Sequence, residues 1–114
     1  MTAPLIDRST PVRPKHPDEK IIQDFDFAPA IEEGSSVSLL SVTMGQWKLD
    51  PDTRNWATTS DLTFGTPSYA SPRAQVAIEG GEDDADYAVR AHGVLSDGAT
   101  PSAVMILQVR AFPQ

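Results

Sequence analysis

Apolar and polar residues alternate along several stretches of this chain, most clearly toward its C-terminal end. Apolar side chains recur at every second position from Tyr87 to Gly93, and they do so again from Met105 to Ala111. A period of two is the pattern of a β-strand with one buried face. Ser96-Asp97-Gly98-Ala99 lies between the two stretches and supplies turn-forming residues. The pattern therefore predicts a β-hairpin in this part of the chain.

Similar alternation predicts further strands upstream, and no stretch predicts a helix. Residues 21–27 place two phenylalanines on one face and two aspartates on the other, and residues 37–44 and 74–79 also alternate. Residues 50–55 are rich in turn formers and are expected to cap a hairpin, while residues 68–72 are expected to form a loop. One of the two tryptophans is expected to fill the centre of the domain. About seven antiparallel strands result, which predicts an all-β, immunoglobulin-like β-sandwich.

Tyr87 occupies a special place in this interpretation. It follows the turn Gly80–Asp86 and opens a predicted strand. In the tyrosine corner of immunoglobulin-like sandwiches, a tyrosine hydroxyl bonds back to the backbone a few residues upstream. We therefore predict a structural role for Tyr87. Sandwiches of this kind are mostly scaffolds and binding modules, which favours a binding function over catalysis.

The first nineteen residues have a different composition. They contain four prolines among charged and hydroxylated residues: Pro4, Pro11, Pro14 and Pro17. Proline lacks a backbone donor, so residues 1–19 are expected to form an extended arm outside the sheets, with residues 20–114 as the sandwich domain. The arm is either a loose terminus or a segment that orders on a neighbouring subunit. Its removal is expected to leave the melting temperature nearly unchanged.

Composition narrows the classes of function. A length of 114 residues suits one domain. The chain has no cysteine, no apolar run long enough for a membrane span and no signal-peptide pattern, so synthesis in the cytoplasm is expected. The net charge is −7, with eleven acidic and five basic residues after position 30. Such a surface repels phosphate backbones, so we expect no nucleic acid as a partner. The lack of an apolar run long enough to span a membrane predicts no membrane partner either.

Few residues are placed in patterns typical of metal binding or catalysis. Two oxygen-rich turns are candidates for calcium or, alternatively, plain solvated loops: Glu79 with Glu82–Asp86, and Asp50, Asp52 and Asn55. The two histidines, His16 and His92, have no motif for nucleophilic catalysis around them. No glycine-rich loop precedes a helix to hold phosphate. We therefore expect no cofactor and no enzymatic activity.

A resemblance to a known group of proteins adds a more specific expectation. The stretch Lys15-His16-Pro17-Asp18-Glu19, the strand of residues 21–27, the pair Gly80-Gly81 and the tyrosine-initiated strand at Tyr87-Ala88-Val89-Arg90-Ala91 resemble small immunoglobulin-like proteins of tailed bacteriophages. Such proteins serve as fibre-to-tail adaptors, neck proteins or head-decoration proteins. The resemblance implies a virion or prophage structural protein, made in the bacterial cytoplasm, that binds capsid, neck, tail or fibre proteins. It implies neither a cofactor nor catalytic residues.

The proline-rich arm and the aromatic residues of the sandwich are the predicted sources of partner contacts. An arm that orders on a partner would present Arg13, Lys15 and His16, and arrayed copies on the particle would strengthen weak contacts. A homo-oligomer or array is therefore expected only on the particle. As an alternative, the sandwich is a binding module for a saccharide or a host surface protein. Trp47, Trp56 and Tyr69 would then form an aromatic platform.

Overall fold

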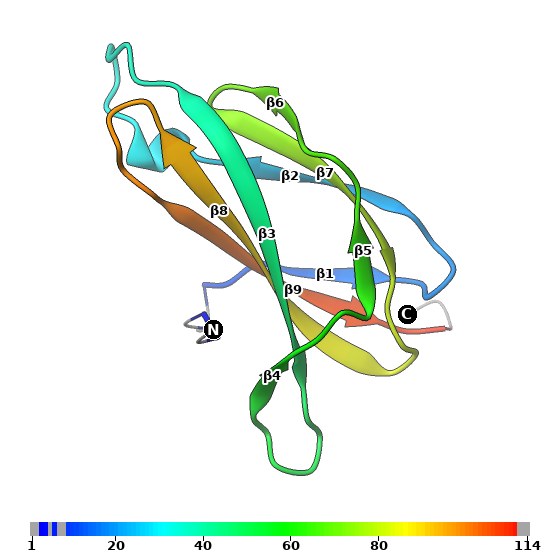
Figure 1. Cartoon of the computed structure of the whole chain (residues 1–114). Coiled ribbons are helices and arrows are strands. Elements are labelled where there is room, and N and C mark those ends of the chain that lie inside the picture. Colours follow the sequence, from blue (N-terminus) through cyan, green and yellow to red (C-terminus); the bar gives the residue numbers. More distant parts are fainter. Residues whose placement is uncertain (1–2, 5, 7–8, 112–114) are drawn as a thin grey trace.

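The protein is a β-sandwich of two sheets packed face to face (Figure 1). A computed structural model of the chain describes residues 3–4, 6 and 9–111. The only helical segment among these residues is one 3-10 turn, η1 (Ala28–Ala30). The predicted all-β fold class is confirmed.

The strands divide unequally between the sheets. The five-stranded sheet has the order β1-β9-β8-β3-β4. Its strands are β1 (Val12–Lys15), β9 (Ser102–Val109), β8 (Ala85–Leu95), β3 (Leu39–Leu49) and β4 (Trp56–Thr58). In the smaller sheet, the order is β2-β7-β5, and β6 also pairs with β7. Its strands are β2 (Ile21–Asp26), β7 (Arg73–Gly80), β5 (Leu62–Phe64) and β6 (Ser68–Ala70).

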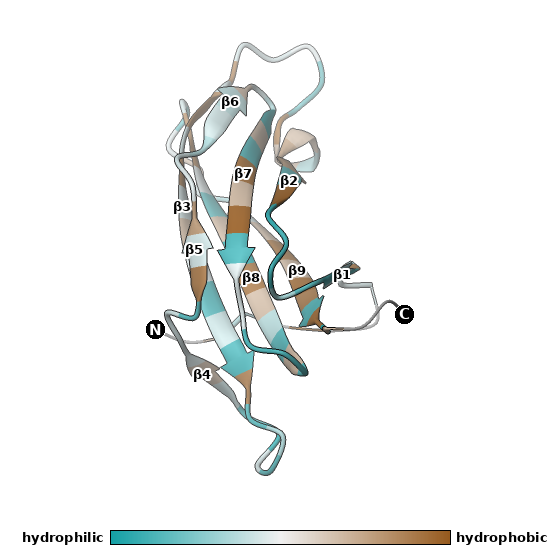
Figure 2. Cartoon of the chain, turned by 90° about the vertical axis from the view of Figure 1, so that its right-hand side faces the viewer, coloured by the Kyte–Doolittle hydropathy of each residue, from teal (hydrophilic) through white to brown (hydrophobic). Residues whose placement is uncertain are grey.

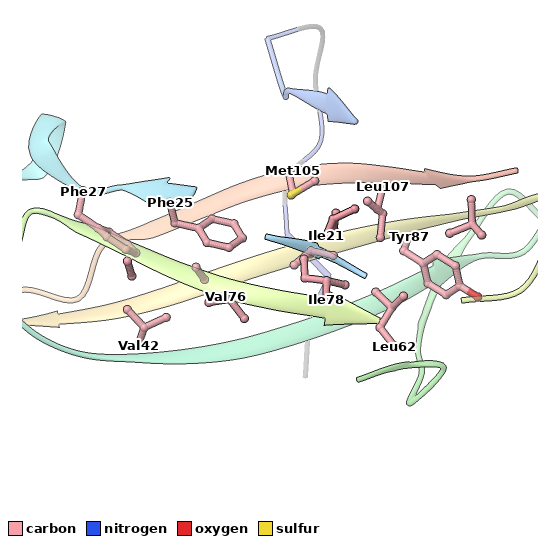
Figure 3. Packing of buried hydrophobic residues seen from close by; sticks show 14 of the residues in the cluster. Ile21, Phe25, Phe27, Val42, Leu62, Val76, Ile78, Tyr87, Met105 and Leu107 are labelled. Carbon is pink, nitrogen blue, oxygen red and sulfur yellow. The ribbon is translucent and has the colours of Figure 1, made fainter. Parts of the chain in front are cut away.

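The main core lies between the two sheets. Side chains from both inner faces fill it, including Phe25 and Ile78 from the smaller sheet and Leu107 from the larger one (Figure 3). Along β7, buried and more exposed residues alternate, and Figure 2 shows the matching bands of hydropathy. This is the alternation that the sequence analysis used to predict the strands.

Strand β1 corrects the prediction that residues 1–19 lack the donors for a ladder. It runs parallel to β9, with Val12 opposite Ile106 and Lys15 opposite Val109. The carbonyls of Pro11 and Lys15 accept N–H groups of Ile106 and Arg110 at 2.8 and 2.9 Å. In a strand, only every second residue points its backbone groups at a given neighbour, so Pro14 turns its missing donor away from β9. An edge strand tolerates proline there, and one strand pair is therefore parallel.

Three further strand predictions need correction. The described residues contain nine strands, whereas about seven were expected. The sequence pattern did not predict all of the short strands, because β4, β5 and β6 are only three residues long and show too little alternation. Ser68–Ala70 was expected to lie in a loop but pairs with β7 as β6. Strand β3 is also longer than expected, and it forms with β4 the hairpin whose tip is residues 50–55.

Trp47 is buried, but it does not lie at the centre of the sandwich. Its side chain is 1% exposed and packs with Ala88 and Ile106 in a cluster separate from the main core. Ala88 stands between Tyr87 and Val89, which both belong to the main core. Because neighbouring residues of a strand face opposite sides, Trp47 lies on the outer face of the five-stranded sheet.

Side chains form hydrogen bonds with the backbone edge of β3 where this strand extends past β4. The hydroxyl of Tyr69 accepts the N–H of Val42 at 3.0 Å, and the hydroxyl of Ser71 accepts the N–H of Leu39 at 3.1 Å. The Gln46 side-chain amide exchanges two hydrogen bonds with the backbone of Leu62 in β5, at 2.8 and 2.9 Å. These bonds occupy backbone groups that would otherwise attract a foreign strand.

Candidate protein-contact surfaces

A ring of polar groups closes one end of the sandwich around Tyr87. The Tyr87 side chain is fully buried, and its hydroxyl accepts the N–H of Glu82, five residues upstream, at 2.8 Å. The same hydroxyl donates to a carboxylate oxygen of Asp61 at 2.8 Å. This geometry joins the start of β8 to the loop before β5. It is the kind of bond that a tyrosine corner makes.

Lys48 completes the ring. Its ammonium lies 3.4 Å from the Asp61 carboxylate and 2.7 Å from the Glu82 carboxylate. The hydrogen bond from Tyr87 lowers the pKa of Asp61, and the bond and charge of Lys48 lower it further. Glu82 in turn raises the pKa of Lys48. These interactions favour the ionised carboxylate of Asp61 and the ionised ammonium of Lys48. The contribution of Asp61 to the stability of the fold is therefore lost as the pH falls through its lowered pKa.

Replacing Tyr87 with phenylalanine tests the value of this corner. Tyr87→Phe leaves the Glu82 N–H and the Asp61 carboxylate without their shared partner, so we expect a loss of about 1 to 3 kcal/mol of unfolding free energy. Tyr69→Phe is the matched control, because Tyr69 also bonds a backbone N–H but is 43% exposed, so that water can replace it. Urea denaturation of both variants gives the comparison. Equal losses would contradict a special role for Tyr87.

The buried phenol also predicts a response to alkali. Burial raises the pKa of Tyr87 to about 12, from the ordinary value of 10.0. A neutral phenol then stabilises the fold fully below pH 10, and this stabilisation is lost as the pH rises toward 12. The chain has two tyrosines, so Tyr69→Phe leaves Tyr87 as the only phenol. Ultraviolet titration should then show no phenolate at pH 10 while circular dichroism still reports folded protein. Half-ionisation near pH 10 in the folded state would contradict this prediction.

Arg110 organises the acidic turn before β8. Its guanidinium lies 2.9 Å from the Asp86 carboxylate and 3.5 Å from that of Asp84, and it also bonds the Ala85 carbonyl. Asp83 accepts the N–H of Ala111 at 2.7 Å. Within the described part of the chain, no three acidic, histidine or cysteine side chains are placed to hold a metal ion. The geometry thus gives these carboxylates protein partners.

The β3–β4 hairpin projects beyond the body of the sandwich (Figure 1). At its tip, the Asp50 carboxylate accepts the N–H groups of Asp52 and Thr53 at 2.8 and 3.3 Å, which is the turn-forming role of aspartate. A further backbone bond joins Arg54 to the Asp50 carbonyl. All six residues of the tip, 50–55, are exposed. The hairpin is therefore an ordered projection whose tip is fully accessible.

The outer face of the five-stranded sheet carries a mainly apolar row that crosses all five strands. Strand register places these residues opposite one another in the order Val12, Ile106, Ala88, Trp47 and Thr58. We call this set the outer row. Beside it, the guanidinium of Arg90 stacks 4.9 Å from the centre of the Trp47 ring. Trp56, Ala3 and Ile6 pack against the same cluster.

The predicted contact residues do not form one surface. Lys15 is 2% exposed and its ammonium bonds the carbonyls of His16 and Gly80, with a pKa lowered by burial. Arg13 is half-buried and bonds the Ile22 carbonyl and the Gln23 side chain. His16 is exposed. The structure thus holds two of the three basic residues of the predicted arm in internal bonds.

The three aromatic residues of the alternative platform are also separated. Trp47 is buried on the outer face of the five-stranded sheet, where Trp56 is half-buried, whereas Tyr69 lies in β6 of the other sheet. A sugar-binding platform needs accessible rings on one surface. The three rings do not form one accessible surface, because Trp47 is covered by neighbouring side chains and Tyr69 lies on the other sheet.

The sequence analysis missed the outer row and the ring around Lys48. The row is hard to recognise because its members come from five strands, and strand register becomes known only from the structure. One signal was present: Ile106 and Ala88 are apolar residues at positions that alternate with core residues. Strands that are apolar on both faces indicate that something covers the second face.

The fold and its surfaces define a small β-sandwich protein with an ordered projecting hairpin and an apolar outer face. None of the described residues forms a helix long and apolar enough to span a membrane. Residues 15–108 match the family model described as podophage GP4 fiber-tail adaptor protein gp77. The chain belongs to this phage adaptor family, and its resemblance to phage tail proteins is confirmed. A search of curated proteins found no match.

Membership in this family supports a role as a structural, virion-associated protein of the bacteriophage tail. Structural adaptors of this kind are in general non-enzymatic.

Proposed function

We propose that this protein joins tail components of a podophage-type virion by binding other virion proteins, without catalysing a reaction. The observation that carries the proposal is the family match, which extends over residues 15–108 and so includes both sheets. A β-sandwich closed at one end by the Tyr87 ring is a rigid body. Such a body is suited to keep two partners at a fixed distance.

The contact surfaces we propose are the tip of the β3–β4 hairpin and the outer face of the five-stranded sheet. The tip is exposed, carries two aspartates and projects from the body. Of the residues predicted from sequence, His16, Trp56 and Tyr69 remain accessible enough to take part. Lys15 and Trp47 are buried in the free chain, so they would serve mainly to hold these surfaces in place.

The finer description of the sandwich as immunoglobulin-like is part of the same proposal. Strand order supports it: β3-β8-β9 are neighbours in one sheet and β2-β7-β5 in the other. In chain order these sets correspond to strands C, F and G facing strands B, E and D. We further propose that copies are arrayed on the particle, where many modest contacts act together.

A phage carrying a nonsense codon in this gene tests the adaptor role. We expect particles grown in a non-suppressing host to retain head proteins but to lack the tail fibre protein, with infectivity restored by the wild-type gene supplied from a plasmid. Particles that carry their normal complement of fibres without this chain would contradict the proposal. A variant with Gln75→Ala, an exposed position on the smaller sheet and outside both proposed contact surfaces, should complement normally and controls for expression.

A further inference from the structure

The free edges of the two sheets differ in their protection. Unpaired N–H and C=O groups along an edge strand attract foreign strands, and proteins hinder this with proline or with side chains. Along β1, Pro14 turns its missing donor toward the free edge, and the next outward N–H, that of His16, donates to the Glu19 carboxylate at 3.1 Å. Along β2, the outward carbonyls of Ile22 and Asp24 accept side-chain bonds at 3.0 and 2.9 Å. Strand addition is therefore hindered at both edges.

Strand β4 has no such protection among the described residues. It is the last strand of the five-stranded sheet and belongs to the projecting hairpin (Figure 1). The Asn55 carbonyl accepts the Asp50 N–H at 2.8 Å, so Asn55, and with it Ala57, turns its backbone groups toward β3. Alternate residues of a strand turn these groups to opposite sides. Trp56 and Thr58 therefore point their N–H and C=O groups outward, where no described residue bonds them.

A groove lies beside this edge on the inner side of the hairpin. Its volume is about 320 Å³, and its lining includes Lys48, Asp50, Ala57 and Asp61. Two carboxylates thus share the groove with one ammonium, which also lies 2.7 Å from the carboxylate of Glu82. The groove has an excess of negative charge and complements a lysine or arginine side chain of a partner.

We propose that an extended segment of another virion protein adds to β4 as a further strand of the larger sheet. Its backbone bonds the outward groups of Trp56 and Thr58, as in other cases of β-strand addition. The partner residue between these two pairs lies opposite Ala57 and extends a basic side chain into the groove. The partner residue opposite Trp56 is apolar, because Trp56 is half-buried beside Trp47 on the outer face. This inference rests on the proposed function, since it names how the adaptor holds one partner.

A second copy of this chain does not meet these requirements. Paired antiparallel through its own β4, it would bring Ala57 to the position where the groove favours a basic residue. Its β1 and β2 edges are hindered by proline and by side-chain bonds. The edge of β4 is also only three residues long, so side chains beside it matter for the choice of partner. The occupant is therefore a different virion protein with a basic, extended segment.

Proline substitution tests the strand addition. Thr58→Pro removes an outward donor and places a ring where the partner strand would lie, and a free strand edge tolerates proline in this orientation. Asp24→Pro is the matched control, since Asp24 also turns its N–H to a free edge, that of β2. Each variant is supplied from a plasmid to the nonsense-mutant phage. We expect circular dichroism to show both variants folded, and infectivity to fall at least about tenfold with Thr58→Pro alone.

A second pair of variants leaves the backbone of β4 unchanged and so decides the question if proline prevents folding. Ala57→Lys places the chain's own ammonium over the groove, where it repels a basic partner residue. Ala99→Lys adds the same charge to the exposed turn between β8 and β9 and is the matched control. We expect at least about a tenfold loss of infectivity with Ala57→Lys and no loss with Ala99→Lys.

The outcomes separate this inference from the adaptor role. Full infectivity with folded Thr58→Pro would overturn strand addition, and full infectivity with Ala57→Lys would overturn the basic residue of the partner. Both results would leave the adaptor role intact. Normal fibre content in particles of the nonsense mutant itself would instead count against the proposed function.

Cross-linking in purified particles identifies the occupant. The chain has no cysteine, so Ser60→Cys, at an exposed position just past β4, carries a unique label. A short photoreactive linker attached there should join this chain to a different virion protein. The same linker at Ile22→Cys, which is 52% exposed on the other sheet, is the control and should give less of that product. A product with a second copy of this chain, or equal yields from both positions, would overturn the proposed occupant.

Discussion

Deleting residues 1–16 should lower the melting temperature by about 10 °C or more, because it removes β1 from the sheet. Strand β9 would lose the carbonyls that accept the N–H groups of Ile106 and Arg110. The Gly80 carbonyl would also lose the ammonium of Lys15, which bonds it at 2.7 Å. Lost partners of buried polar groups cost about 1 to 3 kcal/mol each, so a total of at least about 3 kcal/mol is expected.

A shorter deletion is the matched control. Removing residues 2–9 leaves β1 and its hydrogen bonds in place and takes away only residues that precede it, among them Ala3 and Ile6, so we expect less than half the loss of unfolding free energy. Thermal unfolding followed by circular dichroism compares the two forms with the full chain. The prediction made from sequence, that removing the whole arm leaves the melting temperature nearly unchanged, assumed that no residue of the arm pairs with a sheet. An unchanged melting temperature after deletion of residues 1–16 would contradict the contribution of β1.

Gly80→Ala should destabilise the fold by about 3 to 5 kcal/mol, for two reasons that act together. Gly80 has a φ of +86°, which lies in the left-handed region and disfavours any residue with a Cβ atom. A Cβ atom built at this position would also lie 2.7 Å from the backbone carbonyl oxygen of Asp61. Because that oxygen belongs to the backbone, β5 and β7 would have to separate to make room.

Gly98→Ala isolates the first of these reasons. Gly98 has a similar φ of +90°, but nothing lies within 4 Å of the position of its Cβ atom. This variant should lose only about 1 to 2 kcal/mol, the cost of a left-handed conformation alone. Urea denaturation of the two variants gives the difference directly. Equal losses would show that the approach of Asp61 to Gly80 contributes nothing.

Alternation identified the long strands because each of them has one face in the main core. Phe25 and Ile78 show this well, since each is buried between polar or more exposed neighbours. The same reasoning could not find β4, β5 and β6, whose three residues give at most one repeat of the pattern. Their existence depends on pairing with longer strands such as β7.

The sequence pattern could not predict which face of the sheet carries Trp47, because β3 contains a bulge. Register shifts between Leu39 and Ser41, where Leu40 is an extra residue in β3. One extra residue reverses the face on which every later residue of the strand lies. Val42 and Met44 therefore face the core, and Trp47 faces outward. Reading alternation from Val37 without this bulge assigns the later residues to the wrong faces.

Strand β1 shows the limit of judging a segment by composition. Proline content predicts a segment outside the sheets, yet only the donors of alternate residues are needed for a parallel edge strand. Pro14 falls on the side away from β9, so its missing donor costs nothing there. The partner strand, β9, is more than 80 residues away in the sequence, and nothing local indicates that pairing.

Quantitative mass spectrometry of purified phage particles tests the central claim most directly. The account predicts that this chain is present in several copies per particle, in a fixed ratio to the tail proteins, and that the nonsense mutant lacks both this chain and the tail fibre protein. Intact particles that contain all their other structural proteins but not this chain would contradict it.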